Sequence, residues 1–471
     1  MASARGTLPK RRRALRAPAP VVRASRSLVV AFAVVLAFAF GTAHAEDLLQ
    51  IYREALANDP TLASARASWE ATQELVPQAR AGLLPSVVLV GNANGEHFYE
   101  KLHTDPSITT TQNFPLANYT VSASQPLYRR QNQVALDQAK QSVSQSDYVL
   151  SSARQDLIVR VAQAYLDVLL ARFNIELTES QKAAVSENLA QAKRNFEVGT
   201  ATITDTNDAQ AKYDQIVAQE ISARNDLDNK IATLRSIIGR SPGELKRFGG
   251  AFEPQLPTPN QLESWVDAAV RDNSQVRIAQ ANYDIAVLEV ERQRAGHYPT
   301  LDLVASFNQG YAGATPSIGG SFSNIANDSR TGVIGVQLNV PLYLGGSIES
   351  RVRQAVANLD KARQDLEGAR RGAQLSAQTA FTGVTSGVAQ VNAFDQAVKS
   401  AEVSYESTRV GLEVGVRTNL DVLNQQQQVF QTRFNLAQSY YNFVINGLRL
   451  KQAVGTLSDA DVEELNRALR G

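Results

Sequence analysis

The chain contains two copies of one sequence plan, and this internal repeat limits its fold more than any other feature. Short motifs of the first half return 214 to 216 residues later: Arg80-Ala81-Gly82 as Arg294-Ala295-Gly296, Pro126-Leu127-Tyr128 as Pro341-Leu342-Tyr343, and Val198-Gly199 as Val414-Gly415. A stretch rich in Pro and Gly, residues 241–260, separates the copies. We therefore expect a first structural repeat at 46–240, a second at 261–460, this connector between them, and a C-terminal tail at 461–471.

Each repeat is predicted to hold a short helix, a helix of about 20 residues, a β-hairpin, a very long helix, a tight turn and a second long helix. Residues 129–197 and 346–413 contain no Pro and carry apolar or small residues at steps of three and four. This period of 3.5 is typical of coiled-coil packing. At ~1.5 Å per residue, each stretch could be one helix of roughly 100 Å. The last long helix is expected to pack through Leu420, Leu423, Gln427, Phe430, Phe434, Ala437, Tyr441, Val444 and Leu448.

The segments between paired prolines change to a period of two. Leu301, Leu303 and Phe307 share one face, while polar residues alternate with them. Strands of about ten residues with one apolar face, joined by loops at 91–113 and 308–330, are typical of an outer-membrane β-barrel. Two soluble hairpins are the alternative. Because four strands cannot close a barrel, chains would have to pool their strands, eight from a dimer or twelve from a trimer.

The first 45 residues differ from the rest of the chain. They hold eight Lys and Arg and no acid, then an apolar run at 28–40 and the motif Ala43-His44-Ala45. This pattern predicts a secretory signal peptide, residues 1–45, cleaved after Ala45. A retained membrane anchor is the alternative, but a helix that crosses a ~30 Å hydrocarbon core needs about 20 residues.

Beyond the leader, the composition argues against several classes of protein. The 39 Lys and Arg and 46 Asp and Glu that remain give a net charge of −7, which disfavours a nucleic-acid partner. The chain has no Cys, which excludes disulfides, thiolate metal sites and an acylated Cys. His97 and His103 fall in a predicted outer loop and His297 at a helix–strand junction, and no phosphate-binding loop or HExxH motif occurs. We therefore expect no cofactor and no enzyme activity.

The mature chain resembles the TolC-type outer-membrane efflux and secretion channels. The resemblance rests on Ala295-Gly296-His297-Tyr298-Pro299, Pro341-Leu342-Tyr343-Leu344-Gly345-Gly346, Phe196-Glu197-Val198-Gly199, Ile203-Thr204-Asp205, Val414-Gly415-Val416-Arg417-Thr418 and Val454-Gly455-Thr456-Leu457. It implies a mainly helical fold with a membrane β-barrel, in which a trimer forms a twelve-strand outer-membrane barrel continuous with a twelve-helix periplasmic α-barrel. It also implies that helix becomes strand at four swivel prolines, Pro85, Pro126, Pro299 and Pro341.

The resemblance further implies transport without chemistry. The expected function is the exit duct of a type I secretion or multidrug efflux system, which lies among outer-membrane lipids with its α-barrel in the periplasm. A periplasmic adaptor (membrane fusion) protein and an inner-membrane ABC or proton-driven transporter would recruit it. A soluble periplasmic coiled-coil adaptor or structural rod is the alternative, and the sequence does not choose between a protein toxin and drugs or dyes as cargo.

The same resemblance carries roles to the turns between the long helices. Six residues match tips on which an adaptor docks: Val198, Gly199, Thr200, Val414, Gly415 and Val416. Thr204, Asp205 and Arg417 match residues that bond across neighbouring coiled coils and keep the channel shut, and Leu412 stands where related channels usually have a tyrosine.

Asp421 matches a carboxylate of the family's constriction ring. The second position of that ring is Asn424 here, so a trimer would present three carboxylates at the throat rather than six. From the residues alone, Asp205 and Asp421 have another explanation: acids are favoured in the first turn of a helix by the helix dipole.

Overall fold

The computed structural model describes residues 45–101, 109–247, 254–314 and 326–468. Residues 46–471 form one compact unit, which is described here by itself. Apart from Ala45, the predicted signal peptide lies outside the described residues, and so does His103.

Both repeats run through the same order of elements. The first consists of α2 (Leu48–Asn58), α3 (Pro60–Gln73), α4 (Leu75–Ala81), β1 (Ser86–Lys101), β2 (Thr109–Tyr128), α5 (Arg130–Glu197) and α6 (Ile203–Ile238). The second consists of α7 (Leu262–Asp272), α8 (Ser274–Arg294), the short 3-10 helix η1 (Ala295–His297), β3 (Thr300–Ala312), β4 (Asn327–Asn339), α9 (Ser347–Glu413) and α10 (Asn419–Ala453). The C-terminal tail is largely helical, as α11 (Asp459–Ala468). The two very long helices are confirmed: α5 has 68 residues and α9 has 67.

The helix of about 20 residues expected before each hairpin is whole only in the second repeat, where α8 has 21 residues. In the first repeat the prediction was wrong, because the helix is split into α3 and α4 at Glu74. The cause is Pro77, whose ring would clash with the carbonyl of Gln73 in a continuous helix. Glu291 takes the equivalent place in α8 and imposes no break.

The four strands form one antiparallel sheet in the order β1-β2-β3-β4. They have 13 to 20 residues, longer than expected. Pairing of β1 with β2 extends from Ser86 opposite Ser124 to Lys101 opposite Thr109, so much of the predicted loop 91–113 is strand. His97 lies in β1, 2.5 Å from Asn113 Oδ1, rather than in a loop. The polar face of these strands has the Asn- and Ser-rich composition of a loop, which misled the prediction.

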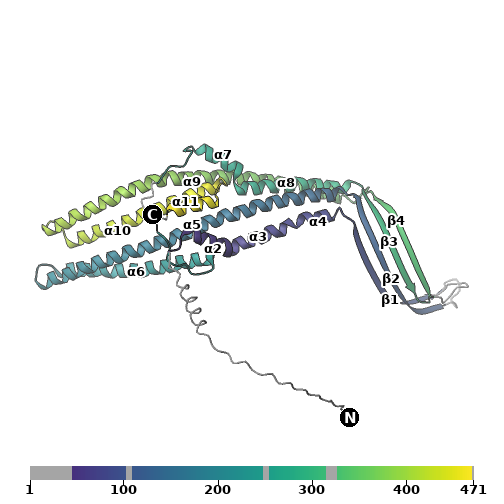
Figure 1. Ribbon diagram of the computed structural model, residues 1–471, viewed down its shortest axis with the longest axis horizontal. Helices are drawn as coiled ribbons and strands as arrows, with labels where there is room; N and C mark the ends of the chain where they lie inside the picture. Colours follow the sequence, from purple (N-terminus) through teal and green to yellow (C-terminus); the bar gives the residue numbers. More distant parts are fainter. Residues whose placement is uncertain (1–44, 102–108, 248–253, 315–325, 469–471) are drawn as a thin grey trace, which may run out of the picture. The chain divides into compact units, whose positions relative to one another are not determined.

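The long helices of the 46–471 unit continue the sheet as a layer, and α2, α7 and α11 pack on that layer near its middle (Figure 1). Next to the sheet, α3 and α4 pack on α5, α5 on α8, and α8 on α9. Farther from the sheet, α6 packs on α5, α5 on α10, and α10 on α9. One edge of the layer is therefore β1, α3, α4 and α6, and the other is β4 and α9.

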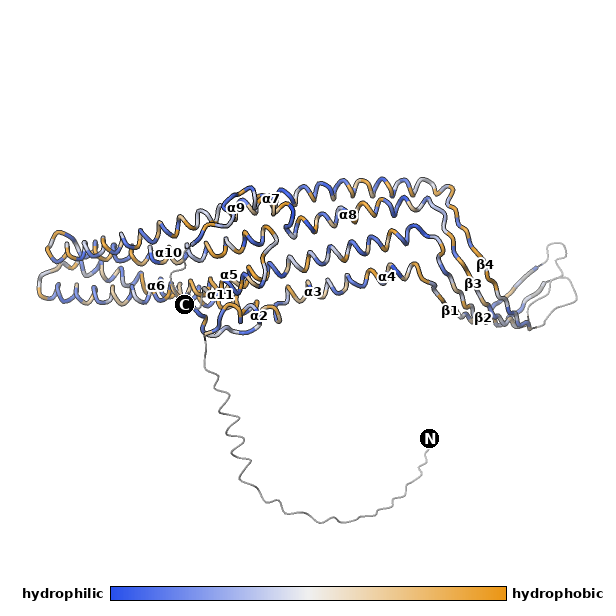
Figure 2. The backbone as a smooth tube through the Cα atoms, turned by 45° about the horizontal axis from the view of Figure 1, so that its top comes forward, coloured by the Kyte–Doolittle hydropathy of each residue, from blue (hydrophilic) through white to orange (hydrophobic). Residues whose placement is uncertain are grey.

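The main core lies midway along the long helices, where α2 and α11 pack on the layer. It includes Leu157, Val161 and Tyr165 of α5, Leu234 of α6 and Leu448 of α10. Hydrophobic and hydrophilic turns alternate along the long helices in Figure 2, while the parts of β1 and β4 nearest the helices are hydrophobic.

The predicted packing stripe of α10 was wrong in part. Burial follows Val422, Gln426 and Val429, whereas Gln427, Phe430 and Phe434 line a groove of about 610 Å³ between α10, α5 and α6. Because α10 packs on α9 as well as on α5, one stripe of period 3.5 cannot describe both of its faces.

Candidate functional site at the helix-hairpin turns

The two turns between long helices lie at the end of the layer away from the sheet (Figure 1). Both are closed by the same backbone bonds. In the first, Gly199 has a φ of 81° and the N–H of Thr200 donates to Asn195 O at 2.8 Å. In the second, Gly415 has a φ of 78° and the N–H of Val416 donates to Gly411 O at 2.9 Å. Glycine suits both positions because other L-residues are strained in the left-handed region.

The second helix of each pair begins with a capping box. Asp205 Oδ2 accepts from the backbone N–H and the hydroxyl of Thr202, at 2.9 and 2.8 Å. Asp421 Oδ2 accepts from the same groups of Thr418, both at 2.9 Å. These bonds hold the pKa of both carboxyl groups below the ordinary value. Both acids therefore stabilise the start of their own helices. Because the capping bonds use Oδ2, Oδ1 of each carboxylate is the oxygen left to accept a bond from a second residue.

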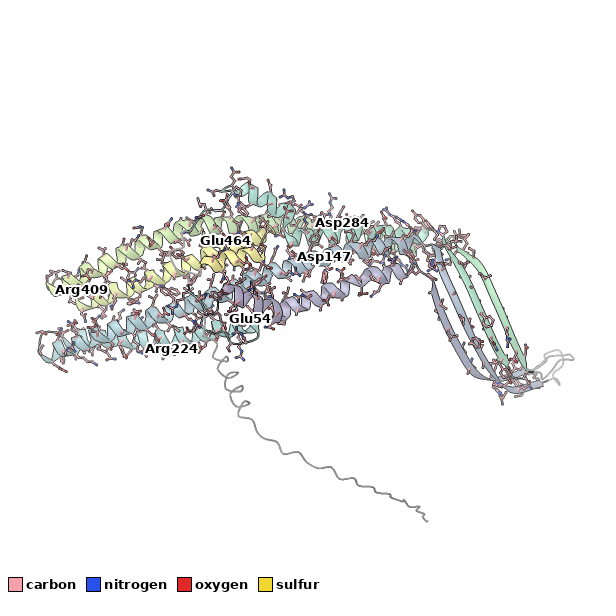
Figure 3. All side chains as sticks on the ribbon, viewed as in Figure 1. Glu54, Asp147, Arg224, Asp284, Arg409 and Glu464 are labelled. Carbon is pink, nitrogen blue, oxygen red and sulfur yellow. The ribbon has the colours of Figure 1, made fainter. Side chains whose placement is uncertain are left out.

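The turns expose apolar side chains. Val198 is 73% exposed, Val414 69% and Val416 75%, while Gly199, Thr200 and Gly415 are also exposed. Exposed apolar groups at the end of a polar helical pair are a usual feature of a protein-binding tip. Near the end of α9, Arg409 (Figure 3) forms ion pairs with Glu406 and Glu413, so charged side chains precede the apolar turn.

The structure does not join all the residues expected to hold the channel shut. Arg417 packs beside Gly411, so that a Cβ added there would lie 2.8 Å from Arg417 Cγ, and its charge contributes to the lowered pKa of Asp421. Within the described part of one copy, no bond links Arg417 to Asp205. Any such bond must therefore form between copies or after the turns move.

The remaining predicted residues of this end are placed as follows. Leu412 is half-buried in the last turn of α9, Thr204 is exposed in the first turn of α6, and Asn424 is exposed one turn after Asp421.

An apolar cluster joins the two helix pairs within one copy; Leu423 belongs to the predicted packing stripe of α10, but its contact with the other helix pair was not predicted. Leu423 of α10 packs with Leu189 of α5 and Ala209 of α6, and Lys212 Nζ donates to Gln427 Oε1 at 3.2 Å. The position of α10 at this end thus depends on packing as well as on charge.

The four prolines expected to be swivels lie at or near the ends of strands. Pro85 and Pro299 directly precede β1 and β3, Pro126 is close to the end of β2, and Pro341 is two residues beyond β4. The strand register shifts between Pro126 and Tyr128.

An ion pair at the same junction, between the buried Asp302 and the half-exposed Arg129, was also missed. Arg129 binds Asp302 in a bidentate manner, at 2.8 Å from Nε and 2.7 Å from Nη2. The two residues are 173 positions apart, and Asp302 reads as one more polar-face residue of a strand, so the sequence pattern held no signal for this contact.

The described residues contain no group of three or more His, Asp or Glu side chains that could hold a metal ion. None of their helices combines the length and the hydropathy that a membrane span requires.

The family model for outer membrane efflux proteins matches residues 51–240 and 265–456. The outer membrane protein TolC of Vibrio cholerae is 34% identical, over 90% of this chain and 94% of its own length. The proteases secretion protein PrtF of Dickeya chrysanthemi is 32% identical, over 93% and 95%. The crystal structure of the Campylobacter jejuni CmeC outer membrane channel has the same fold, with a TM-score of 0.73 at 17% identity over 90% of this chain and 89% of that one.

Proposed function

The chain belongs to the outer membrane efflux protein family, and from this premise we propose that three copies join edge to edge into one duct. The chain is an outer-membrane exit duct of a secretion or efflux system. Its family and fold are those of a channel rather than an enzyme.

The observation that carries the proposal is the open four-wide layer. Strands β1 and β4 are the edge strands of the sheet, and an edge left open in lipid would cost several kcal/mol for each unpaired backbone group. The two edges differ, so copies must join head to tail, and a head-to-tail contact that closes gives a ring. Three copies supply twelve strands, the number that the family resemblance implies.

Exposed apolar side chains on the sheet support its contact with lipid. Val87, Leu89, Ile334, Val336 and Leu338 are all exposed, and they lie on the same face because the register pairs β1 with β2, β2 with β3 and β3 with β4 without a slip in this part. A soluble rod, the alternative function, would leave this apolar face in water.

The ring would work with two partners, a periplasmic adaptor and an inner-membrane ABC or proton-driven transporter. Two relatives support this assignment by their names, the outer membrane protein TolC and the proteases secretion protein PrtF. We assign adaptor docking to the exposed tips, Val198 to Thr200 and Val414 to Val416.

Closure of the duct is assigned to the same end. In a ring, the α6 edge of one copy would lie beside the α9 edge of the next copy. Asp205 and Thr204, at the start of α6, would then lie near Arg417 in the α9–α10 turn of that neighbour. Asp421 and Asn424 would line the throat just inside.

Fractionation and recording test this function together. We expect the mature protein in the outer membrane, a detergent-extracted mass of three copies, and a small planar-bilayer conductance because the periplasmic end is closed. Recovery of a water-soluble single copy from the periplasm would contradict the proposal.

A further inference from the structure

One face of the sheet carries a run of apolar side chains, and toward the far end of every strand this run stops at a polar residue. Because alternate residues of a strand share a face, the register extends the face of Val87 and Leu338 across all four strands. With Gly and Tyr counted in the run, the first polar residues beyond it are His97 on β1, Asn113 on β2, Gln309 on β3 and Arg330 on β4. From Leu338 to Arg330 the strand rises about 27 Å, or about 21 Å across a membrane at a tilt of ~40°, close to the ~25 Å apolar band of such barrels.

Arg330 differs from the other three residues of this boundary because its side chain has no partner. His97 Nδ1 lies 2.5 Å from Asn113 Oδ1, and Gln309 Oε1 accepts from the hydroxyl of Tyr119 at 2.7 Å. Arg330 is exposed and forms no hydrogen bond or ion pair with the described residues of its own copy. A guanidinium at the edge of an apolar belt is therefore left to bind a group from outside the chain.

The charges around Arg330 do not neutralise it. Asp328, two residues farther out on the same face, is about 7 Å away along the strand, and the described residues hold no ion pair between the two. On β1, the other edge strand, the same face continues beyond His97 through Tyr99 and Lys101. These residues add a cation and no carboxylate, so this boundary favours an anionic ligand.

An open notch lies beside Arg330, on the side toward the helices. Gly332 is the next residue of β4 on this face, and a Cβ added to it would meet no atom within 4 Å. Its partner on β3 is Phe307, whose ring is 42% exposed and lies 6.4 Å from the ring of Tyr119. The notch thus has an apolar, aromatic wall and a cation at its outer end.

We propose that Arg330, Gly332 and Phe307 form a binding site for one phosphorylated lipid of the outer leaflet. The lipid phosphate binds the guanidinium, which stays charged and can bond to two phosphate oxygens at once. The acyl chain lies in the notch at Gly332, against the ring of Phe307. This inference rests on the proposed contact of the sheet with lipid and names the lipid chemistry that one part of the sheet selects.

Fluorescence quenching by brominated lipids tests this site. Phe307→Trp is the reporter, because the two native tryptophans, Trp69 and Trp265, lie on α3 and α7 rather than on the sheet. The mature protein is reconstituted in phosphatidylcholine bilayers that contain either brominated phosphatidic acid or brominated phosphatidylcholine. We expect the phosphatidic acid to bind about fivefold better at the reporter, because one cation at an anionic membrane surface contributes roughly this factor.

Variants of the reporter protein separate the parts of the site. Arg330→Gln should bring the preference for phosphatidic acid close to one, and Arg330→Lys should keep part of it, because the charge remains without the bidentate geometry. Gly332→Val fills the notch and should lower quenching by both brominated lipids. A second reporter, Leu303→Trp, faces Val336 in the middle of the apolar run and should show no preference.

The outcomes distinguish this site from the proposed function. An unchanged preference in Arg330→Gln, or an equal preference at the Leu303→Trp reporter, would overturn the proposal. So would loss of the preference in excess inorganic phosphate at constant ionic strength, since the ligand would then be a free anion rather than a lipid. A ring of three copies without any lipid preference removes this site alone, whereas an extracted mass of one copy contradicts the proposed function.

Discussion

The two repeats share their main-chain frame but not the side chains that complete it. At the far ends, Gly199 and Gly415 close the turns by the same bonds, and two capping boxes start the helices that follow. Midway along the layer the repeats diverge. Asp59 caps α3 and binds Arg160, whereas its equivalent, Asn273, caps α8 and donates to Ala453 O. The two repeats thus keep the same backbone geometry and the same helix caps, while the further contact made by the capping side chain differs between them.

The largest effect is expected at the turns, where the repeats are most alike. The double variant Gly199→Trp with Gly415→Trp should abolish export, because bulky side chains at the tips prevent close approach of the adaptor's backbone. Each single variant should reduce export by a similar factor if the turns are equivalent. The readout is secretion or drug resistance, with ring mass as a check of assembly.

The matched control for the tips is Gly199→Asn with Gly415→Asn. Asn tolerates the left-handed region better than other side chains, so it tests backbone strain with less bulk. Normal export by the Trp variant would remove the docking assignment.

Substitution of the glycines that follow α6 and α10 should lower the free energy of unfolding by clearly different amounts in the two repeats. Gly239 and Gly455 both have positive φ, 81° and 72°. A Cβ on Gly239 would lie 3.7 Å from Asn58 Cβ, but one on Gly455 would lie 2.3 Å from the carbonyl oxygen of Asp272. We expect Gly239→Ala to cost about 1–2 kcal/mol from strain alone, and Gly455→Ala about 3 kcal/mol or more.

Urea unfolding of the detergent-extracted protein, followed by circular dichroism, measures this difference. Gly447→Ala, in a helix with open space around the added methyl, is the control and should be neutral or slightly stabilising. Equal losses for Gly239→Ala and Gly455→Ala would show that the clash at Asp272 relaxes without cost.

The ion pair of Asp59 should give the first repeat a pH dependence that the second lacks. Burial alone would raise the pKa of Asp59, but hydrogen bonds from Arg160 and from the N–H of Leu62 outweigh it and hold the pKa below its ordinary value. The stabilisation is therefore present above about pH 4 and is lost as the pH falls through the lowered pKa.

Asp59→Asn should lower the free energy of unfolding by about 1–3 kcal/mol at pH 7. The difference from the parent should vanish at low pH. Asn273→Asp is the matched reverse change in the second repeat. A carboxylate cannot donate to Ala453 O, and the residue equivalent to Arg160 is Ser376, which has no charge to pair with it. A parent-to-variant difference for Asp59→Asn that is constant down to pH 2 would contradict the charge-based account.

A smaller effect is expected at the throat. Asp421→Ala should weaken cation selectivity and block by multivalent cations, because three facing carboxylates are lost. Asp421→Asn keeps an acceptor for the capping box and should have the same effect on selectivity. Asn424→Asp should strengthen selectivity, and reversal potentials in a salt gradient measure all three. Unchanged selectivity in every variant would place these residues outside the conducting path.

Much of the fold was predictable because its signals are local or repeated. The long helices followed from Pro-free stretches with a period of 3.5, and the resemblance to efflux channels is confirmed by the family match. The break at Glu74 was also readable from Pro77. The capping boxes had a sequence signal as well, since Thr202 and Thr418 each stand three residues before an acid.

Other features were not predictable because they depend on contacts between distant segments. The Arg129–Asp302 pair joins the two repeats, and Leu423 of α10 joins a cluster on α5 and α6. The local pattern marks Leu423 as a packing residue of α10 but does not identify its partners, and it marks neither Arg129 nor Asp302 as half of an ion pair. The polar strand residues between 91 and 113 were mistaken for a loop, because only their pairing partners reveal that they face the polar side of a sheet.

Single-channel recording of the purified ring, at low and high salt, tests most directly the claim that the turns close the duct. An exposed ion pair contributes only roughly 0.2–1 kcal/mol, and three symmetric copies about 1–3 kcal/mol together, enough to shift a closed-to-open equilibrium about tenfold or more. We expect a small conductance for the parent, a several-fold increase for Asp205→Ala with Arg417→Ser, and a decrease for Leu412→Tyr. If the double variant conducts like the parent at both salt concentrations, these residues are surface charges, and packing around Leu423 alone keeps the duct shut.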